Sequence, residues 1–386
     1  MRILILTFYY SPDLSAGSFR TTALVKELQK IAKPDDKIDV ITTMPNRYGS
    51  FSDVALEYEE EKNLKINRIN LGSHKSGFID QSKMFLKFAY EVWSLIKKRE
   101  KYDVIYATSS RLMTAFLGSL ISKRQKNKLY LDLRDIFTDT LESVFAKSKL
   151  KYIIPIFRQI EKYTVNSANH INLVSRGFES YFKNINNKIQ YSFYTNGIDD
   201  IFLNYNFRND DKNKKTIITY AGNIGEGQGL EKIIPQMAKK LGNNFEINIY
   251  GDGGRKKALI DKLNGLDNVK LFDPVNRDTL LKVYKRSDIL FLHLNDYEAF
   301  KKVLPSKIFE YAAANKFIVA GVGGYAKEFI EENICDAIVF EPCNIDDFYN
   351  KFINIESFEN INREKFNEKF NRKNIMNSLA KEVFNI

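Results

Sequence analysis

Short apolar runs alternate with longer amphipathic stretches along the first half of the chain. The apolar runs lie at residues 2–8, 37–43, 102–108, 128–135 and 170–175. Helical stretches such as residues 19–32 separate them, with apolar positions that recur every three to four residues. Short runs that are apolar throughout are typical of strands buried on both faces of a parallel sheet, so the pattern predicts alternating strands and helices.

The same pattern starts again in the second half. The polar segment 206–216 precedes new apolar runs at 216–222, 247–253, 268–273, 288–294 and 317–322. With 386 residues, the chain is long enough for two cores. We therefore predict an α/β protein of two doubly wound, Rossmann-like domains. The first is expected at residues 1–200 and the second at 201–369, with a helix at about 370–386 that packs back on the first.

Charge is distributed unevenly between the two halves. The chain has a formal net charge of +11, and residues 1–200 hold 31 Lys and Arg against 22 Asp and Glu. The remaining residues hold 28 against 26. The first half should therefore face an anionic partner, such as nucleic acid, a membrane surface or a phosphorylated substrate.

The cysteine, histidine and hydropathy patterns argue against a metalloprotein, a secreted protein and a membrane-spanning protein. The two cysteines, Cys335 and Cys343, and the three scattered histidines show no metal-ligand spacing, so no metal site is expected. The apolar start of the chain reads as a first strand rather than a signal peptide. No apolar stretch is long enough to span a bilayer, and we expect a protein of the cytoplasm.

Two glycine-bearing turns follow predicted strands in the second half. The segment YAGNIGEGQGL places Gly222, Gly225, Gly227 and Gly229 between a strand and a helix, and YGDGG (250–254) ends another strand. Glycine lets the backbone approach a ligand, and a helix N-terminus offers free N–H groups to a phosphate. Tight turns without a ligand are the plain alternative. The first βα turn lacks G-x-G-x-x-G, so an NAD-dependent dehydrogenase is set aside.

The segment VLPSKIFEYAAANKFIVAG (303–321) is the second candidate. Pro305 suits the first turn of a helix, where Ser306 and Lys307 would face an anion. Glu310 lies three residues beyond Lys307, and its carboxylate could accept both hydroxyls of a ribose. A surface Lys–Glu pair would give the same spacing.

Several motifs together carry a family resemblance. The loop at Gly17, TNGID (195–199), YAGNIGEGQGLEKI, YGDGG and PSKIFEYAAANK resemble the family-4 retaining glycosyltransferases of the GT-B fold, whose two domains face across a cleft. LTFYYSPDLSAGSFR, TTMPNRYGSF and ATSSRLMTAFLG are similar to WbuB-like O-antigen enzymes.

This resemblance implies a function. It implies the transfer of N-acetyl-L-fucosamine, or a related N-acetylated deoxy sugar, from a UDP-sugar to a polyprenyl-diphosphate-linked saccharide. The pathway would be O-antigen, lipopolysaccharide or capsule biosynthesis. The reaction would need no metal or other cofactor.

The resemblance also implies site residues. Catalytic roles fall to Arg134, Asp135, Lys302 and Lys307. Donor-binding roles fall to Gly17, Ser18, Gly222, Asn223, Gly225, Gln228, Gly251, Gly253, Pro305, Ser306 and Glu310.

The sequence departs from the family pattern at three places. Lys302 replaces the first of two carboxylates, and Asn223 and Gln228 replace an Arg and a Lys that grip the phosphates. Arg134 and Asp135 stand where relatives keep a histidine. Lys302 and Lys307 are therefore expected to meet the phosphate charge. Strand-end neighbours in the first domain are Arg47, Thr108, Ser109 and Arg111.

Two basic and apolar segments predict binding to an anionic membrane. One helical stripe in residues 82–101 holds Met84, Phe85, Phe88, Ala89, Val92, Leu95 and Ile96, flanked by lysines. Residues 146–163 mix Lys147, Lys149 and Lys151 with large apolar side chains. We expect peripheral association with the inner face of the cytoplasmic membrane. A helix that faces the core is the alternative.

Two other functions fit parts of the sequence. A UDP-sugar epimerase shares the two-domain architecture, but it needs acid–base groups and the sequence offers no cluster beyond Asp135. The basic isoelectric point would also suit a nucleic-acid-binding protein. No binding module for nucleic acid is recognisable, so we expect no nucleic-acid partner.

Overall fold

The computed structural model describes most of the chain. The described residues are 1–13, 15–45, 55–72, 78–109, 112–145, 149–209, 215–355, 358 and 361–386. Arg47, Arg111 and Lys147, which the sequence analysis singled out, lie outside them. The chain divides into two compact units, Met1–Asn196 with Arg372–Ile386, and Gly197–Asn371. The expected boundaries were residue 200 and about residue 370.

The first unit is built on one eight-stranded sheet with the order β3-β4-β2-β1-β5-β6-β7-β8. All neighbouring strands pair in parallel except β3 and β4, which are antiparallel. The sequence pattern missed β3, β4 and β8, because they are short or partly polar. The strands are β1 (Arg2–Leu6), β2 (Lys37–Thr43), β3 (Tyr58–Glu61), β4 (Leu64–Ile69), β5 (Val104–Thr108), β6 (Lys128–Leu133), β7 (His170–Leu173) and β8 (Gln190–Ser192).

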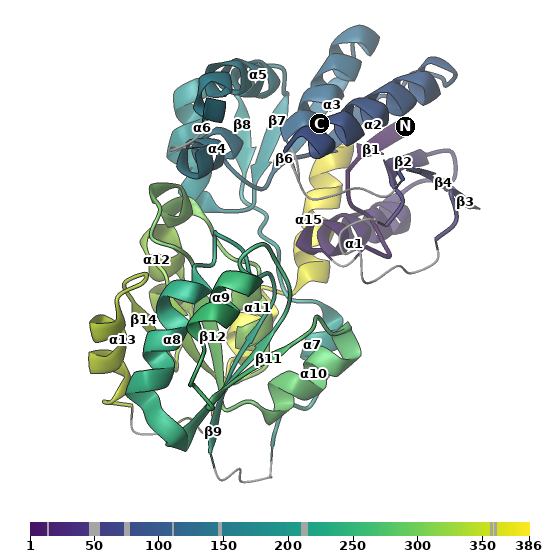
Figure 1. Cartoon of the computed structure of the whole chain (residues 1–386). Helices are drawn as coiled ribbons and strands as arrows, with labels where there is room; N and C mark the ends of the chain where they lie inside the picture. The colour runs from purple at the N-terminus through teal and green to yellow at the C-terminus, as the bar shows by residue number, and fades with distance from the viewer. Residues whose placement is uncertain are drawn as a thin grey trace. The chain divides into compact units, whose positions relative to one another are not determined.

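Helices cover both faces of this sheet (Figure 1). The last helix of the chain packs on the first, and its buried side chains share a core cluster with those of α1 and the central strands. The helices are α1 (Ala16–Ile31), α2 (Phe78–Lys97), α3 (Leu112–Gln125), α4 (Phe137–Phe145), α5 (Ile154–Asn166), α6 (Glu179–Ile185) and α15 (Arg372–Phe384), with 3-10 helices η1 (Lys149–Ile153) and η2 (Arg176–Phe178).

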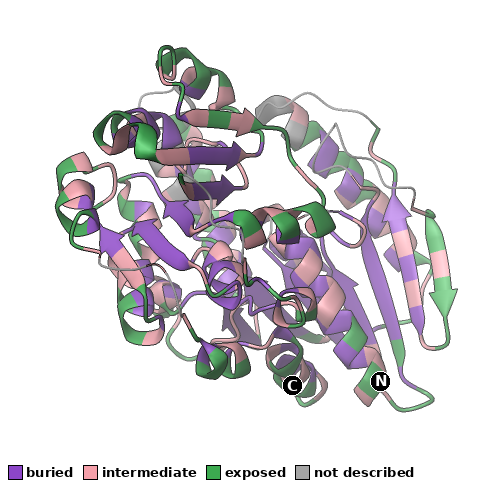
Figure 2. Ribbon diagram, turned by 90° about the horizontal axis from the view of Figure 1, so that it is seen from below, coloured by how far each residue is buried: buried purple, intermediate pink, exposed green. Residues whose placement is uncertain are grey.

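Helix α2 turns its predicted membrane-facing stripe inward. Met84, Phe85, Phe88, Val92 and Ile96 are buried, and the Phe88 ring packs edge-on against Phe8 with 5.2 Å between centroids. The prediction that this stripe faces a membrane is therefore wrong. Helix α2 is amphipathic because it covers the sheet, and its described exposed side chains lie opposite the buried stripe. Figure 2 shows the same division in other helices, which are buried on part of their surface and exposed on the rest.

The second unit is built on one six-stranded parallel sheet with the order β11-β10-β9-β12-β13-β14. Strands β12 and β13 are buried along their whole length, as the uninterrupted apolar pattern predicted. The pattern missed β14. The strands are β9 (Thr216–Ala221), β10 (Phe245–Tyr250), β11 (Val269–Phe272), β12 (Ile289–His293), β13 (Phe317–Gly321) and β14 (Ala337–Phe340).

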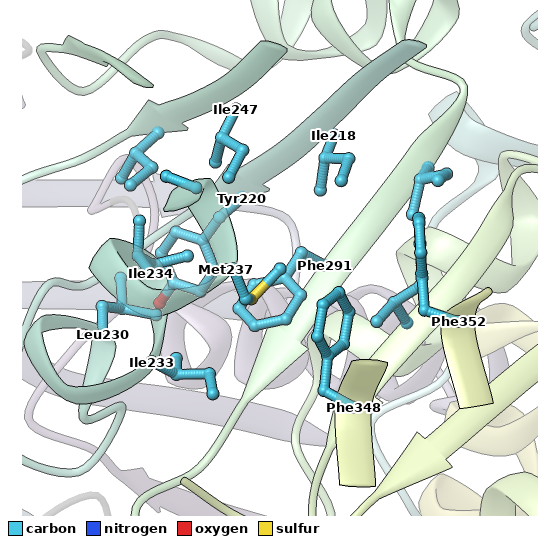
Figure 3. Close-up of a cluster of buried hydrophobic side chains, with 14 of the residues drawn as sticks. Ile218, Tyr220, Leu230, Ile233, Ile234, Met237, Ile247, Phe291, Phe348 and Phe352 are labelled. Atoms are coloured by element: carbon cyan, nitrogen blue, oxygen red, sulfur yellow. The ribbon is translucent and has the colours of Figure 1, made fainter. Parts of the chain in front are cut away.

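One core cluster lies between this sheet and helices α8, α9 and α13 (Figure 3). Tyr284 and Tyr311 lie on the opposite face, in edge-to-face contact with 5.4 Å between their centroids. The helices are α7 (Asp200–Leu203), α8 (Leu230–Leu241), α9 (Lys256–Lys262), α10 (Arg277–Arg286), α11 (Lys307–Ala313), α12 (Gly324–Asn333), α13 (Ile345–Phe352) and α14 (Glu364–Lys369), with 3-10 helices η3 (Gly242–Asn244) and η4 (Glu298–Lys302).

Candidate active site

The two glycine-bearing turns of the second unit lie against each other. The N–H of Gly222 donates to the Tyr250 carbonyl at 2.8 Å, and the N–H of Ile224 donates to the Asp252 carbonyl at 2.9 Å. Gly251 has a φ of +152°, and a Cβ added there would lie 1.8 Å from the Gly222 carbonyl oxygen. Contact between the two backbones therefore explains why Gly251 must be glycine, without a ligand.

Lys307 from α11 lies over the first glycine turn. A Cβ on Gly222, whose φ is +148°, would lie 2.3 Å from both Cε and Nζ of Lys307. The Nζ atom also lies 5.1 Å from the centroid of the Tyr220 ring, which is within the range of a cation–π contact. Burial lowers the pKa of the Lys307 ammonium, and the charge of Glu310 opposes this shift. The second sheet thus presents a partly desolvated cation at the end of β9.

Helix α11 begins later than the sequence predicted. It spans Lys307–Ala313, and Ser306 precedes it without a capping hydrogen bond from its side chain. Pro305 lies ahead of the helix, where its carbonyl accepts a hydrogen bond of 3.2 Å from the N–H of Ile308. The placement of Pro305 in the first helical turn is therefore wrong. The helix has only seven residues, so its side chains, rather than its N-terminus, are the groups to consider as ligand contacts.

Lys302 and Glu310 are both half-buried in the second unit. Lys302 ends the 3-10 helix η4, and Glu310 lies in the first turn of α11, because this helix begins only at Lys307.

Asn223 and Gln228, which replace the expected Arg and Lys, bind each other. The Nδ2 of Asn223 donates to the Oε1 of Gln228 at 2.9 Å. The same Oε1 accepts a hydrogen bond of 3.3 Å from the N–H of Gly225. The turn is therefore closed by neutral amides. Gly253 packs against it, because a Cβ there would lie 2.5 Å from the Ile224 carbonyl oxygen.

The sequence analysis missed a further set of polar side-chain contacts around the turn. Glu226 forms an ion pair with Arg255 and accepts a hydrogen bond from the Tyr297 hydroxyl at 2.5 Å. The Nζ of Lys232 donates to the Oδ1 of Asn295 at 2.7 Å. These residues come from four separate segments, so no spacing in the sequence could have indicated that they meet.

The other predicted residues belong to the first unit. Gly17 and Ser18 are buried in the first turn of α1, where the N–H of Ser18 donates to the Ser15 Oγ at 3.1 Å. The hydroxyl of Ser18 is buried and has no hydrogen-bond partner among the described residues. Thr108 and Ser109 are buried in the same unit, at the end of β5.

Arg134 and Asp135 follow β6 but differ in their surroundings. The guanidinium of Arg134 donates to the Ala16 carbonyl and to the Asn196 Oδ1, both at 3.3 Å. Burial lowers the pKa of Arg134. Asp135 is exposed. Arg134 therefore fixes the start of α1 and the end of the unit, a structural role that its sequence position did not indicate.

The described residues contain no group of three or more His, Cys, Asp or Glu placed to hold a metal ion. Within these same residues, no helix has the length and hydropathy to cross a bilayer.

The second unit combines a half-buried ammonium with a turn of glycine amides. Such an arrangement can bind and stabilise an anion, because the ammonium is positively charged and amide N–H groups carry partial positive charge.

Comparison with known families finds a match for this unit. The family described as "Glycosyl transferases group 1" matches residues 203–373, which is nearly all of the second unit. The second unit is thus similar to the group 1 glycosyl transferases. This is the enzyme class that the sequence motifs predicted.

One curated relative adds a sequence match in the same class. The chain is 25% identical over 232 residues to the protein named "Putative colanic acid biosynthesis glycosyl transferase WcaI" of Escherichia coli K12. The match spans 55% of this chain and 56% of that protein. The chain therefore matches about half the length of this curated relative.

Solved structures share the fold over the whole chain. Sucrose-phosphate synthase from Thermosynechococcus elongatus has a TM-score of 0.73 at 12% identity and covers 100% of this chain and 99% of that one. Anabaena HepE in complex with UDP and glucose has a TM-score of 0.69 at 14% identity, with 100% of both chains covered.

A solved structure whose description names a different activity also matches. A protein described as a putative UDP-N-acetylglucosamine 2-epimerase from Listeria monocytogenes has a TM-score of 0.58 at 11% identity and covers 99% of this chain and 95% of its own. At these identities the likeness shows the fold alone. The chain has the GT-B fold, as the sequence predicted.

Proposed function

We propose that the chain is a retaining glycosyltransferase that uses a UDP-sugar donor. The acceptor would be a polyprenyl-diphosphate-linked saccharide in the assembly of O-antigen, capsule or a related polysaccharide. The sugar would be N-acetyl-L-fucosamine or another N-acetylated deoxy sugar. The match to the group 1 glycosyl transferases, the match to WcaI and the UDP bound in HepE support this proposal.

The position of Lys307 carries the proposal. Its Nζ lies over the glycine turn that follows β9, in contact distance of Gly222. Within the described residues, no hydrogen-bond acceptor holds this ammonium, which contacts the Tyr220 ring and senses the charge of Glu310. A cation kept half-buried without a bound carboxylate is suited to a diphosphate.

The proposed reaction needs stabilisation of its leaving group. The bond between the sugar C1 and the β-phosphate oxygen of UDP breaks, and its electron pair stays on the phosphate oxygen. The acceptor hydroxyl forms the new bond to C1 on the same face, and its proton passes to the leaving diphosphate. Lys307 and the glycine amides would stabilise the developing charge, while Glu310 accepts the ribose hydroxyls.

Replacement of Lys307 tests this role. Lys307→Met keeps the aliphatic stem over Tyr220 but removes the charge, and kcat should fall about 100-fold or more. Lys257→Met in helix α9 is a matched control, because it removes one positive charge from the same unit at an exposed lysine. Transfer of radiolabelled sugar to a lipid-linked acceptor measures the effect. Full activity of Lys307→Met would contradict the assignment.

The alternative that the chain is a UDP-sugar epimerase is tested by incubating the protein with a UDP-sugar alone. A transferase incubated with a UDP-sugar and no acceptor should leave the sugar configuration unchanged or hydrolyse it slowly. An epimerase would change the configuration at a ring carbon, which nuclear magnetic resonance detects directly.

We also propose that the first unit docks on anionic lipid, through a different face from the one the sequence suggested. On α2, Leu86 and Tyr90 are 67% and 73% exposed, and the exposed Lys83 and Lys87 lie one turn away on the same face. Apolar side chains beside lysines suit the boundary between lipid headgroups and acyl chains.

Liposome sedimentation tests this face. Leu86→Ser with Tyr90→Ser, and separately Lys83→Glu with Lys87→Glu, should each reduce binding to vesicles that contain anionic lipid. Lys257→Glu with Lys262→Glu changes the charge equally in the second unit and should not reduce it. Binding that is unaffected by salt and by the α2 variants would reject the proposal.

A further inference from the structure

The glycine turn of the second unit is fastened to the end of β12 through three consecutive carbonyl groups. The Nδ2 of Asn295 donates to the Glu226 carbonyl at 2.8 Å, and the N–H of Asn295 donates to the Gly227 carbonyl at 2.8 Å. The Nδ1 of His293 lies 2.6 Å from the Gln228 carbonyl. Residues 293–295 therefore hold the whole outer part of the turn.

The hydrogen bonds of His293 determine its tautomer. The N–H of Cys343 donates to the Nε2 of His293 at 3.0 Å, so Nε2 must be an unprotonated acceptor. The Gln228 carbonyl can only accept, so Nδ1 carries the proton. The ring is fully buried, which favours the same neutral form. His293 is thus a fixed link between Cys343, beyond β14, and the glycine turn.

This fastening sets the direction of the amides in the turn. A trans peptide is planar, so the N–H that follows a carbonyl points to the opposite side. With the Glu226 and Gln228 carbonyls held at β12, the N–H groups of Gly227 and Gly229 point away from it. Within the described residues, these two N–H groups have no acceptor in the protein.

We infer that His293 is a positioning residue for the donor diphosphate. By fixing the Gln228 carbonyl it orients the amides of Gly227 and Gly229 toward the anion, in a turn that lacks the arginine and lysine expected there. These neutral amides, held in a fixed orientation, would stabilise part of the phosphate charge that the arginine and lysine would otherwise stabilise. This inference rests on the proposed use of a UDP-sugar.

Two conservative variants separate the two hydrogen bonds of the ring. Asparagine places its Nδ2 at the branch position of Nδ1, so His293→Asn can keep the donor to the Gln228 carbonyl. Glutamine places its Oε1 near Nε2, so His293→Gln can keep the acceptor for Cys343 but loses the bond to the turn. Calorimetric titration with UDP, paired with Tm measured without ligand, compares them.

The expected result is a split between the two variants. His293→Gln should raise the Kd for UDP about tenfold, because the Gln228 carbonyl loses its donor and the turn relaxes. His293→Asn should stay within about threefold of the wild type, although both variants lower Tm. Equal Kd values for the two variants, or Kd values that follow Tm alone, would overturn the inference.

Asn295→Asp provides a second variant if the histidine variants do not fold. It keeps the shape of the side chain and its contact with Lys232, but it replaces the donor to the Glu226 carbonyl with an acceptor. The Kd for UDP should again rise about tenfold, and an unchanged Kd would count against the inference. If the wild-type protein binds no UDP, the proposed function fails instead.

Discussion

The two units share one architecture but satisfy their buried polar groups in different ways. Beneath the first sheet, Arg20 and Asp132 are completely buried and form two hydrogen bonds, of 2.8 Å and 2.9 Å. In the second unit, His293 is buried as a neutral ring. The buried Arg363 there donates to main-chain carbonyls, including those of Cys335 at 2.9 Å and Lys316 at 2.9 Å.

This difference distinguishes positively charged side chains that stabilise the fold from those that could bind a ligand. In the first unit, the guanidinium groups bind other parts of the protein. Arg20 also donates to the Thr195 carbonyl, and Arg134 donates to the Ala16 carbonyl at the start of α1. In the second unit, the glycine turn is held by neutral amides and by the ion pair between Glu226 and Arg255, and the Lys307 ammonium remains available for a ligand. A net positive charge along the sequence therefore does not identify where an anion binds.

The largest expected effect is in the first unit. Asp132→Asn leaves the Arg20 guanidinium buried without its counter-charge, and the free energy of unfolding of that unit should fall by about 3–5 kcal/mol. Urea denaturation with hydrogen exchange measured for each unit locates the loss. The double variant Arg20→Met with Asp132→Leu removes both charges and should recover most of the stability. Equal damage in single and double variants would show that charge pairing is not what stabilises this core.

Acid should affect the two units over different pH ranges. Burial lowers the pKa of His293 from 6.5 to about 4, while the nearby charge of Lys232 acts in the same direction. The folded pKa lies below the unfolded one, so the stabilisation is complete above pH 6.5 and is lost as the pH falls to about 4. The loss should reach about 3 kcal/mol in the second unit.

The first unit should respond only at lower pH. Burial favours protonation of Glu382, but hydrogen bonds from His170 and Tyr130 outweigh it and lower the pKa of Glu382 to about 2. Its contribution is therefore present above about pH 4.5 and is lost below that. Hydrogen exchange at pH 7.5, 5.5 and 4.5 should show the second unit weakening first. In His293→Asn this difference should disappear, and its persistence would exclude the histidine as the cause.

The sequence was sufficient for the fold but not for the polar contacts of the site. Apolar runs such as 289–293 and 317–321 are buried on both faces, and any buried parallel strand requires that pattern. Strand β3 was missed because its residues Tyr58–Glu61 are largely exposed and carry no burial pattern to read.

The sequence could indicate contacts of the candidate site only where a compact motif holds the residues. The sequence assigned the glycine turn and Lys307 to one site, because each lies in a compact motif, and the structure brings the two into contact. The contacts of His293 were not predicted, because they join Gln228 to Cys343 across more than a hundred residues of sequence. A single sequence records which residues are apolar, but not which carbonyl a distant donor reaches.

The smallest expected effect on stability falls on the turn itself. Gly222→Ala places a methyl group at a φ of +148°, which alanine rarely adopts, and should lower the free energy of unfolding of the second unit by about 1–3 kcal/mol. The new Cβ would also displace the Cε and Nζ of Lys307, which can move because they end a flexible side chain. The Kd for UDP should therefore rise about tenfold or more, beyond what the stability loss alone explains.

Gly254→Ala is the matched control for this variant, because a Cβ at Gly254 would have no heavy atom within 4 Å. It should leave both Tm and the Kd for UDP close to those of the wild type. In Lys307→Met, which has no ammonium to displace, adding Gly222→Ala should change the Kd little further. An additive loss of affinity in the double variant would mean that Gly222 shapes the turn independently of Lys307. The uncharged part of the turn would then contribute to binding separately from the lysine.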